Sequence, residues 1–303
     1  MTNPSPWLQA ARLRTLPLAI GAITMGAFAA NMDGVFKWDI YLLCILTAVL
    51  LQVLSNFAND YGDFKKGTDN EQRVGPKRAL QSGIITEKAM LRAVVVFSVL
   101  SLSSGIVLIW LSLRDFSDWR MLLMLLFGIA AVAAAIKYTV GKNAYGYSGW
   151  GDVFVFIFFG LMAVTGTYFL MGHTLTWMTL LPAICFGCLS AGVLNINNIR
   201  DIENDKASNK ITVAVKLGRN KAKIYQTVLM LVAAKTIFWY LWGSSIWIFL
   251  LSAVLFIPIL VSFLRVLNNK PGEEPLLNRE LKSLSLGSAL LSVGIFAASF
   301  FVK

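Results

Sequence analysis

The sequence contains little of the chemistry on which many metal centres and hydrolases depend. Its 303 residues include one histidine, His173, and three cysteines, Cys44, Cys185 and Cys188. One histidine is too few for a histidine-based metal centre, and it argues against a Ser-His-Asp triad. The cysteines supply no disulfide framework, and the CFGC stretch that begins at Cys185 is interpreted as apolar packing. A catalytic site in this chain therefore has to use carboxylates, amides and basic side chains.

Charge is also scarce. Charged residues make up 14% of the chain, against about 25% in a typical soluble domain. The apolar residues, 57% of the total, form long runs, and a run of about 20 lets a helix cross the hydrocarbon core of a bilayer. We predict an all-α integral membrane protein that forms a single transmembrane domain, residues 1–303. Its bundle of nine transmembrane helices should lie near residues 16–32, 38–58, 89–113, 121–139, 152–171, 175–196, 224–243, 246–267 and 284–302.

The basic residues are distributed unevenly between the two ends of the predicted helices. If the N-terminus faces the cytoplasm, most of the 27 Lys and Arg residues fall on the cytoplasmic side. This positive-inside pattern predicts an N-in, C-out topology. It also accounts for the net charge of +11, so we expect membrane lipid as a partner and no nucleic acid.

Two long, charged cytoplasmic loops follow the second and sixth predicted helices, at about residues 59–88 and 197–223. If the helices continue into these loops, four polar residues of each share one face, because successive helical residues are about 100° apart. These sets are Asn56, Asn59, Asp60 and Asp63 in the first loop, and Asn197, Asn198, Asp201 and Asp205 in the second. The two sets resemble each other as the halves of an internal repeat would, and their helices run in the same direction. We therefore predict two Asp-rich motifs on cytoplasmic caps.

Two carboxylate pairs at one end of a bundle repel each other unless a cation lies between them. Mg²⁺ prefers oxygen ligands and is commonly shared between one or two carboxylates and substrate phosphates. Basic residues that could bind such phosphates surround both motifs: Lys65, Lys66, Arg73, Lys77 and Arg78 in the first loop, and Arg200, Lys206 and Lys210 in the second. One charged loop alone is usually a solvated cap, but two matched loops favour a site for Mg²⁺ and a diphosphate.

These motifs resemble those of the intramembrane aromatic prenyltransferases of the UbiA superfamily. The superfamily pattern is N-D-x-x-D after the second helix and D-x-x-x-D after the sixth, and the chain has NDYGD at 59–63 and DIEND at 201–205. Stretches such as NFANDYGDFKKGTDN, RVGPKRALQSGIIT and YGYSGWGDVFVFIFFG are similar to the branch that prenylates 1,4-dihydroxy-2-naphthoate in menaquinone biosynthesis. Many superfamily members have a third aspartate four residues after the first motif, where this chain has Gly67, and its next acid is Asp69.

The resemblance implies a reaction and a set of site residues. A polyprenyl group would move from its diphosphate to the aromatic acid with Mg²⁺ as cofactor, and the ring carboxylate would be lost, giving demethylmenaquinone in a bacterial inner membrane. Mg²⁺ ligands would be Asp60, Asp63, Asp201 and Asp205, with Asn56 and Asn59 orienting them or the diphosphate. The diphosphate would meet Lys65, Arg73, Lys77 and Arg200. Arg14, Lys137, Tyr138, Tyr147 and Asp152 would position the acceptor, unless they act only as anchors at the membrane interface.

Other functions remain possible on the residues alone. The same fold and ionisation chemistry could serve another acceptor, such as 4-hydroxybenzoate, homogentisate or haem. A secondary transporter of an anionic solute would place polar residues near the middle of the bilayer, whereas these acids lie at helix ends. A soluble terpene synthase also uses aspartate-rich motifs, but it does not need nine apolar runs. Glycines within the spans, such as Gly160 and Gly187, would either leave room for the polyprenyl tail or allow close helix packing.

Overall fold

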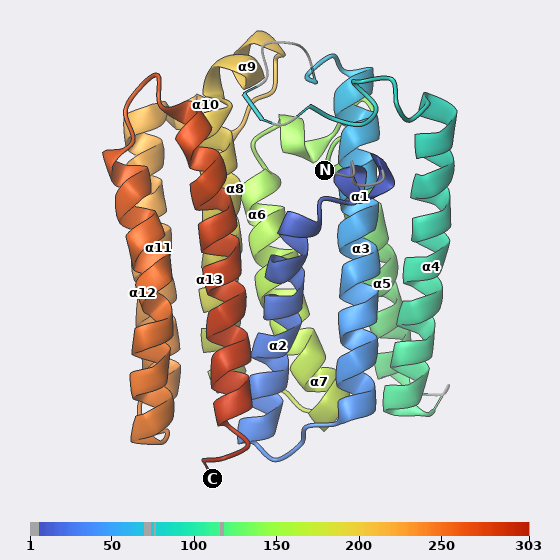
Figure 1. The fold of residues 1–303 in the computed structure, drawn as a ribbon. Helices are drawn as coiled ribbons and strands as arrows, with labels where there is room; N and C mark the ends of the chain where they lie inside the picture. The colour runs from blue at the N-terminus through green and yellow to red at the C-terminus, as the bar shows by residue number, and fades with distance from the viewer. Residues whose placement is uncertain (1–5, 70–73, 76, 116–117, 303) are drawn as a thin grey trace.

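The computed structural model describes residues 6–69, 74–75, 77–115 and 118–302, and the described chain is built from helices (Figure 1). In chain order these are α1 (Pro6–Ala11), η1 (Leu13–Thr15), α2 (Leu16–Met32), α3 (Trp38–Lys65), α4 (Glu87–Leu113), α5 (Trp119–Lys137), η2 (Tyr145–Tyr147), α6 (Gly151–Val155), η3 (Phe156–Thr165), α7 (Gly166–Gly172), η4 (Trp177–Thr179), α8 (Leu180–Arg200), α9 (Ile202–Ala207), α10 (Val213–Leu217), α11 (Arg219–Leu241), α12 (Ile246–Asn268), η5 (Glu274–Leu276) and α13 (Leu277–Ala298).

Nine helical segments in the described ranges are long and apolar enough to cross a membrane, which confirms the predicted fold class. They are Pro6–Met32, Trp38–Lys65, Glu87–Leu113, Trp119–Lys137, Gly151–Gly172, Trp177–Arg200, Arg219–Leu241, Ile246–Asn268 and Glu274–Ala298. The first of these begins as α1 and η1 before α2 starts, and Pro17 lies in the first turn of α2, where its missing N–H costs no hydrogen bond.

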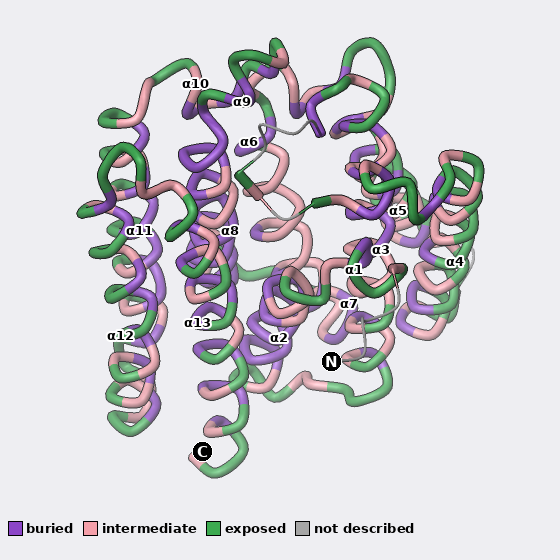
Figure 2. Tube along the Cα trace, turned by 45° about the horizontal axis from the view of Figure 1, so that its top comes forward, coloured by how far each residue is buried: buried purple, intermediate pink, exposed green. Residues whose placement is uncertain are grey.

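The helices differ greatly in how much of their surface the protein itself covers. In the apolar windows of the α2 and α8 segments 67% of residues are buried, against 22% in α4 and 11% in α5. Figure 2 shows this contrast: α2 and α8 are largely buried (purple), whereas α4 and α12 have long exposed stretches (green). The exposed positions of α4 and α5 are apolar, for example Val95, Trp110 and Leu122. Such surfaces suit contact with lipid, whereas α2 and α8 form the protein core.

The fifth membrane-spanning segment changes helix type along its length. It begins as α6, widens into the ten-residue π-helix η3 and ends as α7. Gly160 of η3 packs directly on α8, since a Cβ at Gly160 would lie 2.5 Å from the Cα of Gly187. Of the two roles predicted for these glycines, the structure therefore supports close packing of two helix backbones.

Both aspartate motifs lie at the same end of the bundle. α3 and α8 end there, as Figure 1 shows, and the short helices α9 and α10 cover the same end. α3 continues as one helix to Lys65, so the first motif is helical, as predicted. The second motif is not one uninterrupted helix, because α8 ends at Arg200 and α9 starts at Ile202. Asp201 lies between the two helices, with φ −101° and ψ 12°. The prediction that one continuous helix carries Asn197 through Asp205 is therefore wrong at this residue.

Candidate active site

Asp60 of the first motif is buried and is contacted by two arginines. Only 1% of its surface is exposed. Nη1 of Arg78, from the loop after α3, lies 2.9 Å from Asp60 Oδ1, and the Arg12 guanidinium binds the same oxygen. Arg78 also lies 3.6 Å from a carboxylate oxygen of Asp69. One carboxylate thus shares its charge with cations from two distant parts of the chain.

Asn56 positions the N-terminal segment that carries Arg12. Its side-chain amide donates to the backbone carbonyl of Ala11 at 2.8 Å and to Oγ1 of Thr15 at 3.0 Å. Arg12 itself adopts φ 50°, a left-handed conformation that is uncommon for residues other than glycine. The contacts of Asn56 on either side of Arg12 hold this turn in place. Sequence reasoning used Arg12 only to assign topology, because nothing local linked it to the motif 48 residues away.

Asp63 and Tyr147 form the link between the first motif and the loop after α5. The Tyr147 hydroxyl donates to Asp63 Oδ1 at 2.8 Å and lies 2.6 Å from Oγ1 of Thr68. The ammonium group of Lys66 lies 3.8 Å from the centre of the Tyr147 ring, and that of Lys210 lies 5.5 Å away. Burial, and then the charge of Asp63, raises the pKa of Tyr147, so its hydroxyl remains a donor at physiological pH.

The glycine in NDYGD allows the loop after α5 to approach α3 closely. A Cβ on Gly62 would lie 2.5 Å from Oγ1 of Thr139, nearer than real Cβ contacts come. Thr139 in turn donates to the carbonyl of Ala58 at 2.9 Å, and its hydroxyl lies 3.4 Å from Oδ1 of Asn59. Gly62 therefore lets the α5–α6 loop pack against the motif helix, which brings Tyr147 within reach of Asp63.

In the second motif, Asp201 is paired with its own chain neighbour. Arg200 donates two hydrogen bonds to Asp201, at 2.8 and 2.5 Å, and others to Oδ1 of Asn197 and Oδ1 of Asn278. Both Arg200 and Asp201 are buried, at 2% and 5% exposure. Arg200 was predicted to contact a diphosphate, and in the structure it joins the end of α8 to the start of α13 through Asn278.

Asp205 lies one helical turn beyond Asp201, and its surroundings differ. Its backbone N–H donates to the carbonyl of Asp201 at 2.8 Å, and its carboxylate lies 3.6 Å from the ammonium group of Lys210. Burial raises the pKa of Asp205 to about 6; Lys210 opposes this rise, while the nearby Asp201 and Asp63 carboxylates add to it. The effect of Asp63 on this pKa is consistent with acids of both motifs lying at one end of the bundle.

Direct hydrogen bonds also join the two motif regions. The side-chain amide of Asn204 donates to the carbonyl of Thr68 at 3.2 Å, and the backbone N–H of Ile211 donates to the carbonyl of Tyr147 at 3.2 Å. Ser148 and Ile211 form a short parallel β-bridge. The loop after α3, the loop around η2 and the segment after α9 thus form one polar assembly at this end of the bundle.

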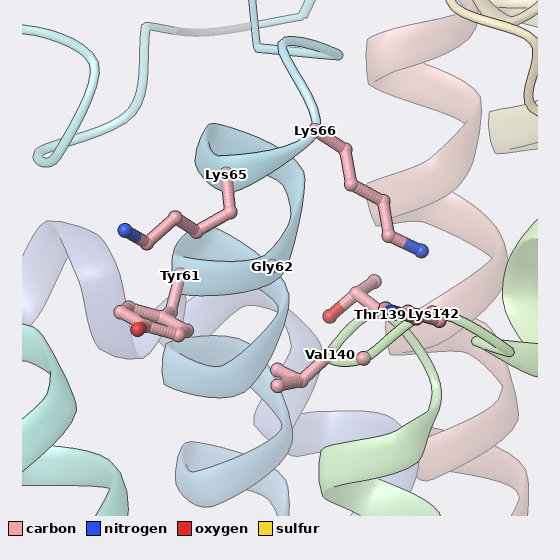
Figure 3. Close-up of a pocket in the computed structure, with 8 residues that line it drawn as sticks. Tyr61, Gly62, Lys65, Lys66, Thr139, Val140 and Lys142 are labelled. Atoms are coloured by element: carbon pink, nitrogen blue, oxygen red, sulfur yellow. The ribbon is translucent and has the colours of Figure 1, made fainter.

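The basic residues predicted to bind the diphosphate do not all lie beside the motif acids. Figure 3 shows that Lys65 and Lys66 extend in different directions from the end of α3. The ammonium group of Lys65 lies 2.6 Å from Glu87 of α4 and is half exposed, so the structure does not bring it to the acids. Lys66 instead extends toward Thr139 and Lys142, and both Lys65 and Lys66 line a cavity of about 410 Å³ with these two residues. Arg73 lies outside the described residues.

A second cavity, of about 270 Å³, brings together several predicted residues with Arg12. Its lining combines four cations with a motif acid: Arg12, Arg14, Lys77, Arg78 and Asp60. Arg14 was predicted to contact the acceptor, and Lys77 the diphosphate; both are exposed side chains at this cavity. Four cations beside one carboxylate leave a surplus of positive charge, which suits an anionic ligand.

The other predicted acceptor contacts fall into two groups. Lys137 is exposed at the end of α5. Tyr138, the next residue, packs against the first turn of α6, since a Cβ on Gly151 would lie 3.3 Å from its hydroxyl. Burial, and then the charge of Asp152, raises the pKa of Tyr138. Asp152 is 5% exposed and interacts with Tyr225, a neighbour that sequence reasoning did not identify.

The donor set of the motifs can be tested against Mg²⁺. Within the described ranges, no three His, Cys, Asp or Glu side chains lie close enough together to hold one metal ion by themselves. Mg²⁺ typically takes only one or two carboxylates from the protein and completes its octahedron with water and substrate phosphates. Two buried oxygens of the second motif region, Asp205 Oδ2 and Asn198 Oδ1, have no hydrogen-bond partner. Pairs of oxygen ligands of this kind fit a Mg²⁺ ion that is shared with a phosphorylated substrate.

The fold and this site define a class of protein: a polytopic membrane enzyme whose acid and basic residues gather at one end of a helical bundle. A model of the UbiA prenyltransferase family matches residues 19–284. The chain belongs to that family and is an aromatic prenyltransferase. The predicted superfamily and enzyme class are thereby confirmed.

Similar proteins include proteins named 1,4-dihydroxy-2-naphthoate octaprenyltransferase from several bacteria. The chain is 39% identical to a 1,4-dihydroxy-2-naphthoate octaprenyltransferase of Escherichia coli, over 99% of this chain and 98% of that protein. It is 47% identical to the enzyme of that name from Haemophilus influenzae, over 75% of this chain and 74% of the relative. A Mycobacterium tuberculosis protein of the same name is 38% identical over 77% of each chain.

Solved structures share the fold at low sequence identity. A UbiA homologue from Archaeoglobus fulgidus, bound to DMAPP and Mg²⁺, aligns with a TM-score of 0.67 at 16% identity and covers 99% of this chain and 100% of its own. The apo structure of a homologue from Aeropyrum pernix K1 aligns with a TM-score of 0.66 at 16% identity, over 97% of each chain. These likenesses extend over the whole helical bundle.

Proposed function

We propose that the protein transfers a polyprenyl group from its diphosphate to 1,4-dihydroxy-2-naphthoate in a Mg²⁺-dependent reaction that releases the ring carboxylate and gives demethylmenaquinol, the hydroquinone whose later oxidation yields demethylmenaquinone. The observation that carries this proposal is the meeting of the two aspartate motifs around Tyr147 and Asn204. Similarity to naphthoate octaprenyltransferases along nearly the full length supports the choice of acceptor. The whole chain, residues 1–303, would act as one catalytic domain in a bacterial inner membrane.

Asp60, Asp63, Asp201 and Asp205 would hold Mg²⁺, directly or through water. When bound, Mg²⁺ would neutralise part of the charge that develops on the diphosphate leaving group. The guanidinium groups beside the motif acids are placed to share that charge. Arg12 and Arg78 are the best candidates, because they line the basic cavity with Lys77 and touch Asp60. Asn56 would act through Arg12, and Asn59 through Thr139.

The allylic fragment that forms as the carbon–oxygen bond breaks has to be kept from water. Aromatic rings line the region next to the acids: Tyr138 and Tyr145 pack edge to face with ring centres 5.3 Å apart, and Tyr145 stacks on Phe154 at 4.0 Å. Such rings exclude water and offer their π faces to a cation. They also suit an electron-rich aromatic acceptor, whose ring would attack the allylic carbon.

The experiment is a turnover assay of the purified protein in lipid, with a polyprenyl diphosphate and 1,4-dihydroxy-2-naphthoate, in the presence and absence of Mg²⁺. We expect a Mg²⁺-dependent prenylated product whose mass lacks the carboxylate. Product with 4-hydroxybenzoate but none with the naphthoate would overturn the acceptor and retain the reaction type. Product formation that is unchanged after complete removal of divalent metal would overturn the role of Mg²⁺.

A further inference from the structure

Asp152 is a buried acid at the start of a membrane-spanning segment, far in sequence from both aspartate motifs. It lies in the first turn of α6 and is 5% exposed. The Tyr225 hydroxyl of α11 lies near enough to interact with its carboxylate, while Oδ1 has no hydrogen-bond partner. Ionisable groups in membrane-spanning segments are expensive and usually functional. The unpaired oxygen is available to accept a hydrogen bond from a ligand.

Asp152 borders the same interior region as the motif acids. A Cβ on Gly151 would lie 3.3 Å from the Tyr138 hydroxyl, so this hydroxyl packs against the first turn of α6. The Tyr138 side chain also lies within the electrostatic reach of Asp63 and Asp205. Tyr138 therefore packs directly against the turn of α6 that carries Asp152. An acceptor that reaches the diphosphate site from this side passes next to Asp152.

The surroundings of Asp152 suit a planar aromatic acid with ring hydroxyls. Phe154, two residues along α6, stacks on Tyr145, and Tyr145 packs against Tyr138. Aromatic rings prefer offset or edge-to-face packing on such surfaces. A hydroxyl on the stacked ring could donate to the unpaired oxygen of Asp152. The direction of that bond matters, because Asp152 would be the acceptor and could take the proton.

We propose that Asp152 accepts a hydroxyl proton from the aromatic acceptor during carbon–carbon bond formation and returns it when the carboxylate leaves. This assignment rests on the proposed function. Tyr225 acts as a positioning residue that holds the carboxylate of Asp152 in one orientation. Asp152 was expected only to position the acceptor, and the proton transfer adds a chemical role.

The step balances without a net proton. As the ring attacks, a bond forms between its carboxylate-bearing carbon and the allylic carbon, and the allylic carbon–oxygen electron pair leaves with diphosphate. The hydroxyl proton moves to Asp152 and the ring oxygen becomes a carbonyl. Release of CO₂ then returns the electron pair of the broken carbon–carbon bond to the ring. The carbonyl oxygen takes the proton back, and the Asp152 carboxylate is regenerated for the next turnover.

The test compares Asp152→Asn with Asp152→Glu and Tyr225→Phe in the full-length protein in lipid. Asparagine keeps the shape of the side chain but cannot accept the proton. We expect kcat for naphthoate prenylation to fall by about 10²- to 10⁴-fold, the usual contribution of a positioned acid or base. Asp152→Glu should retain part of kcat, and Tyr225→Phe should lower kcat less than Asp152→Asn does. The Kd for polyprenyl diphosphate with Mg²⁺ should stay unchanged in all three, which also shows that they fold.

A pH series separates proton transfer from a structural role. The titratable groups next to Asp152 are Tyr138 from the segment after α5 and Tyr225 from α11, and Cys188 of α8 lies near Tyr225. In Asp152→Asn the acceptor would have to lose its proton to water first, so kcat should rise steadily as pH approaches the phenol pKa of about 10. The wild-type protein should show no such rise over the same range.

Two results would overturn the proposal: wild-type kcat in Asp152→Asn, or a reduced kcat in that variant that does not respond to pH. Asp118→Asn, at the N-terminus of α5, is the matched control and should behave as wild type. Failure of the wild-type protein itself to prenylate the naphthoate would instead overturn the proposed function, and with it this role of Asp152.

Discussion

The two aspartate motifs look alike in sequence, but their charges are balanced in different ways. Asp60 of the first motif binds Arg12, 48 residues earlier in the chain, and Arg78, 18 residues later. Asp201 of the second motif binds Arg200, its immediate neighbour. The first motif therefore depends on how the N-terminal segment folds over α3, whereas the second carries its counter-charge within α8.

The difference extends to the second acid of each motif. Asp63 is held by a neutral donor, the Tyr147 hydroxyl, while Asp205 faces the ammonium group of Lys210. The acids of the first motif thus find their partners in several loops, whereas those of the second motif find theirs among nearby residues of the same segment. If both regions hold Mg²⁺, loss of either acid should be equally harmful, but loss of their cations should not.

The largest expected effect is loss of a motif acid. Asp60→Asn and Asp201→Asn should each lower turnover by at least about 10²-fold, because a misplaced or missing metal removes electrostatic stabilisation of the leaving diphosphate. The measurement is product formation in lipid at saturating Mg²⁺. Asp118→Asn serves as the control, because Asp118 pairs with Arg120 away from both motifs. Near-normal turnover in either motif variant would remove the two-motif Mg²⁺ site.

Replacing an arginine should affect the two motifs to different extents. Arg200→Ala leaves the buried Asp201 carboxylate without its partner, and breaking a buried pair typically costs about 3–5 kcal/mol of stability. Arg12→Ala should cost less, because Asp60 keeps Arg78. Thermal unfolding in detergent measures the stability loss, and the KM for polyprenyl diphosphate should rise more in Arg12→Ala. Equal destabilisation by the two variants would contradict the contrast between a local and an assembled motif.

A smaller effect is expected at the contact between the two regions. Tyr147→Phe keeps the ring beneath Lys66 but removes the hydroxyl that binds Asp63 and Thr68. A hydrogen bond to a charged group contributes about 1.5–3 kcal/mol, so kcat/KM should fall by roughly 10- to 150-fold if the whole contribution is lost, with the lower end expected because Asp63 stays near the Lys66 ammonium group. Thr68→Val is the comparison, since it removes the other partner of the same hydroxyl. A larger loss in Thr68→Val would assign the main role to the loop instead of Asp63.

The helices and the acids of both motifs follow from local patterns in the sequence. Long apolar runs fix the membrane-spanning segments, and the 100° helical repeat predicted one shared face if the second helix continues through NDYGD, as α3 does before it ends at Lys65. The same reasoning failed at Asp201, where α8 ends, because a break of one residue leaves no mark in the pattern of polar residues. Local patterns thus predicted which acids lie at the ends of these helices, but not the exact path of the backbone.

Partners that come from distant parts of the chain could not be predicted. Arg12 reaches Asp60 because its left-handed turn is held by Asn56. Tyr225 comes near Asp152 because α6 and α11 both pack on α8, which no spacing in the sequence encodes. The π-helix η3 is likewise a consequence of packing, since Phe156–Thr165 has the composition of an ordinary membrane helix. Assignments of basic residues from sequence were therefore less secure than those of the acids.

Lys65 and Lys66 provide the smallest and most local comparison, because adjacent residues at the end of α3 point apart (Figure 3). Lys65→Met should change turnover by less than about twofold, since its exposed pair with Glu87 is screened by water. Lys66→Met should raise the KM for polyprenyl diphosphate by about tenfold, the usual effect of losing one charge-assisted contact. Burial lowers the pKa of Lys66, while the charge of Asp63 opposes that shift. The reverse order of effects would place the diphosphate on the α4 side of α3 and would support the role predicted for Lys65.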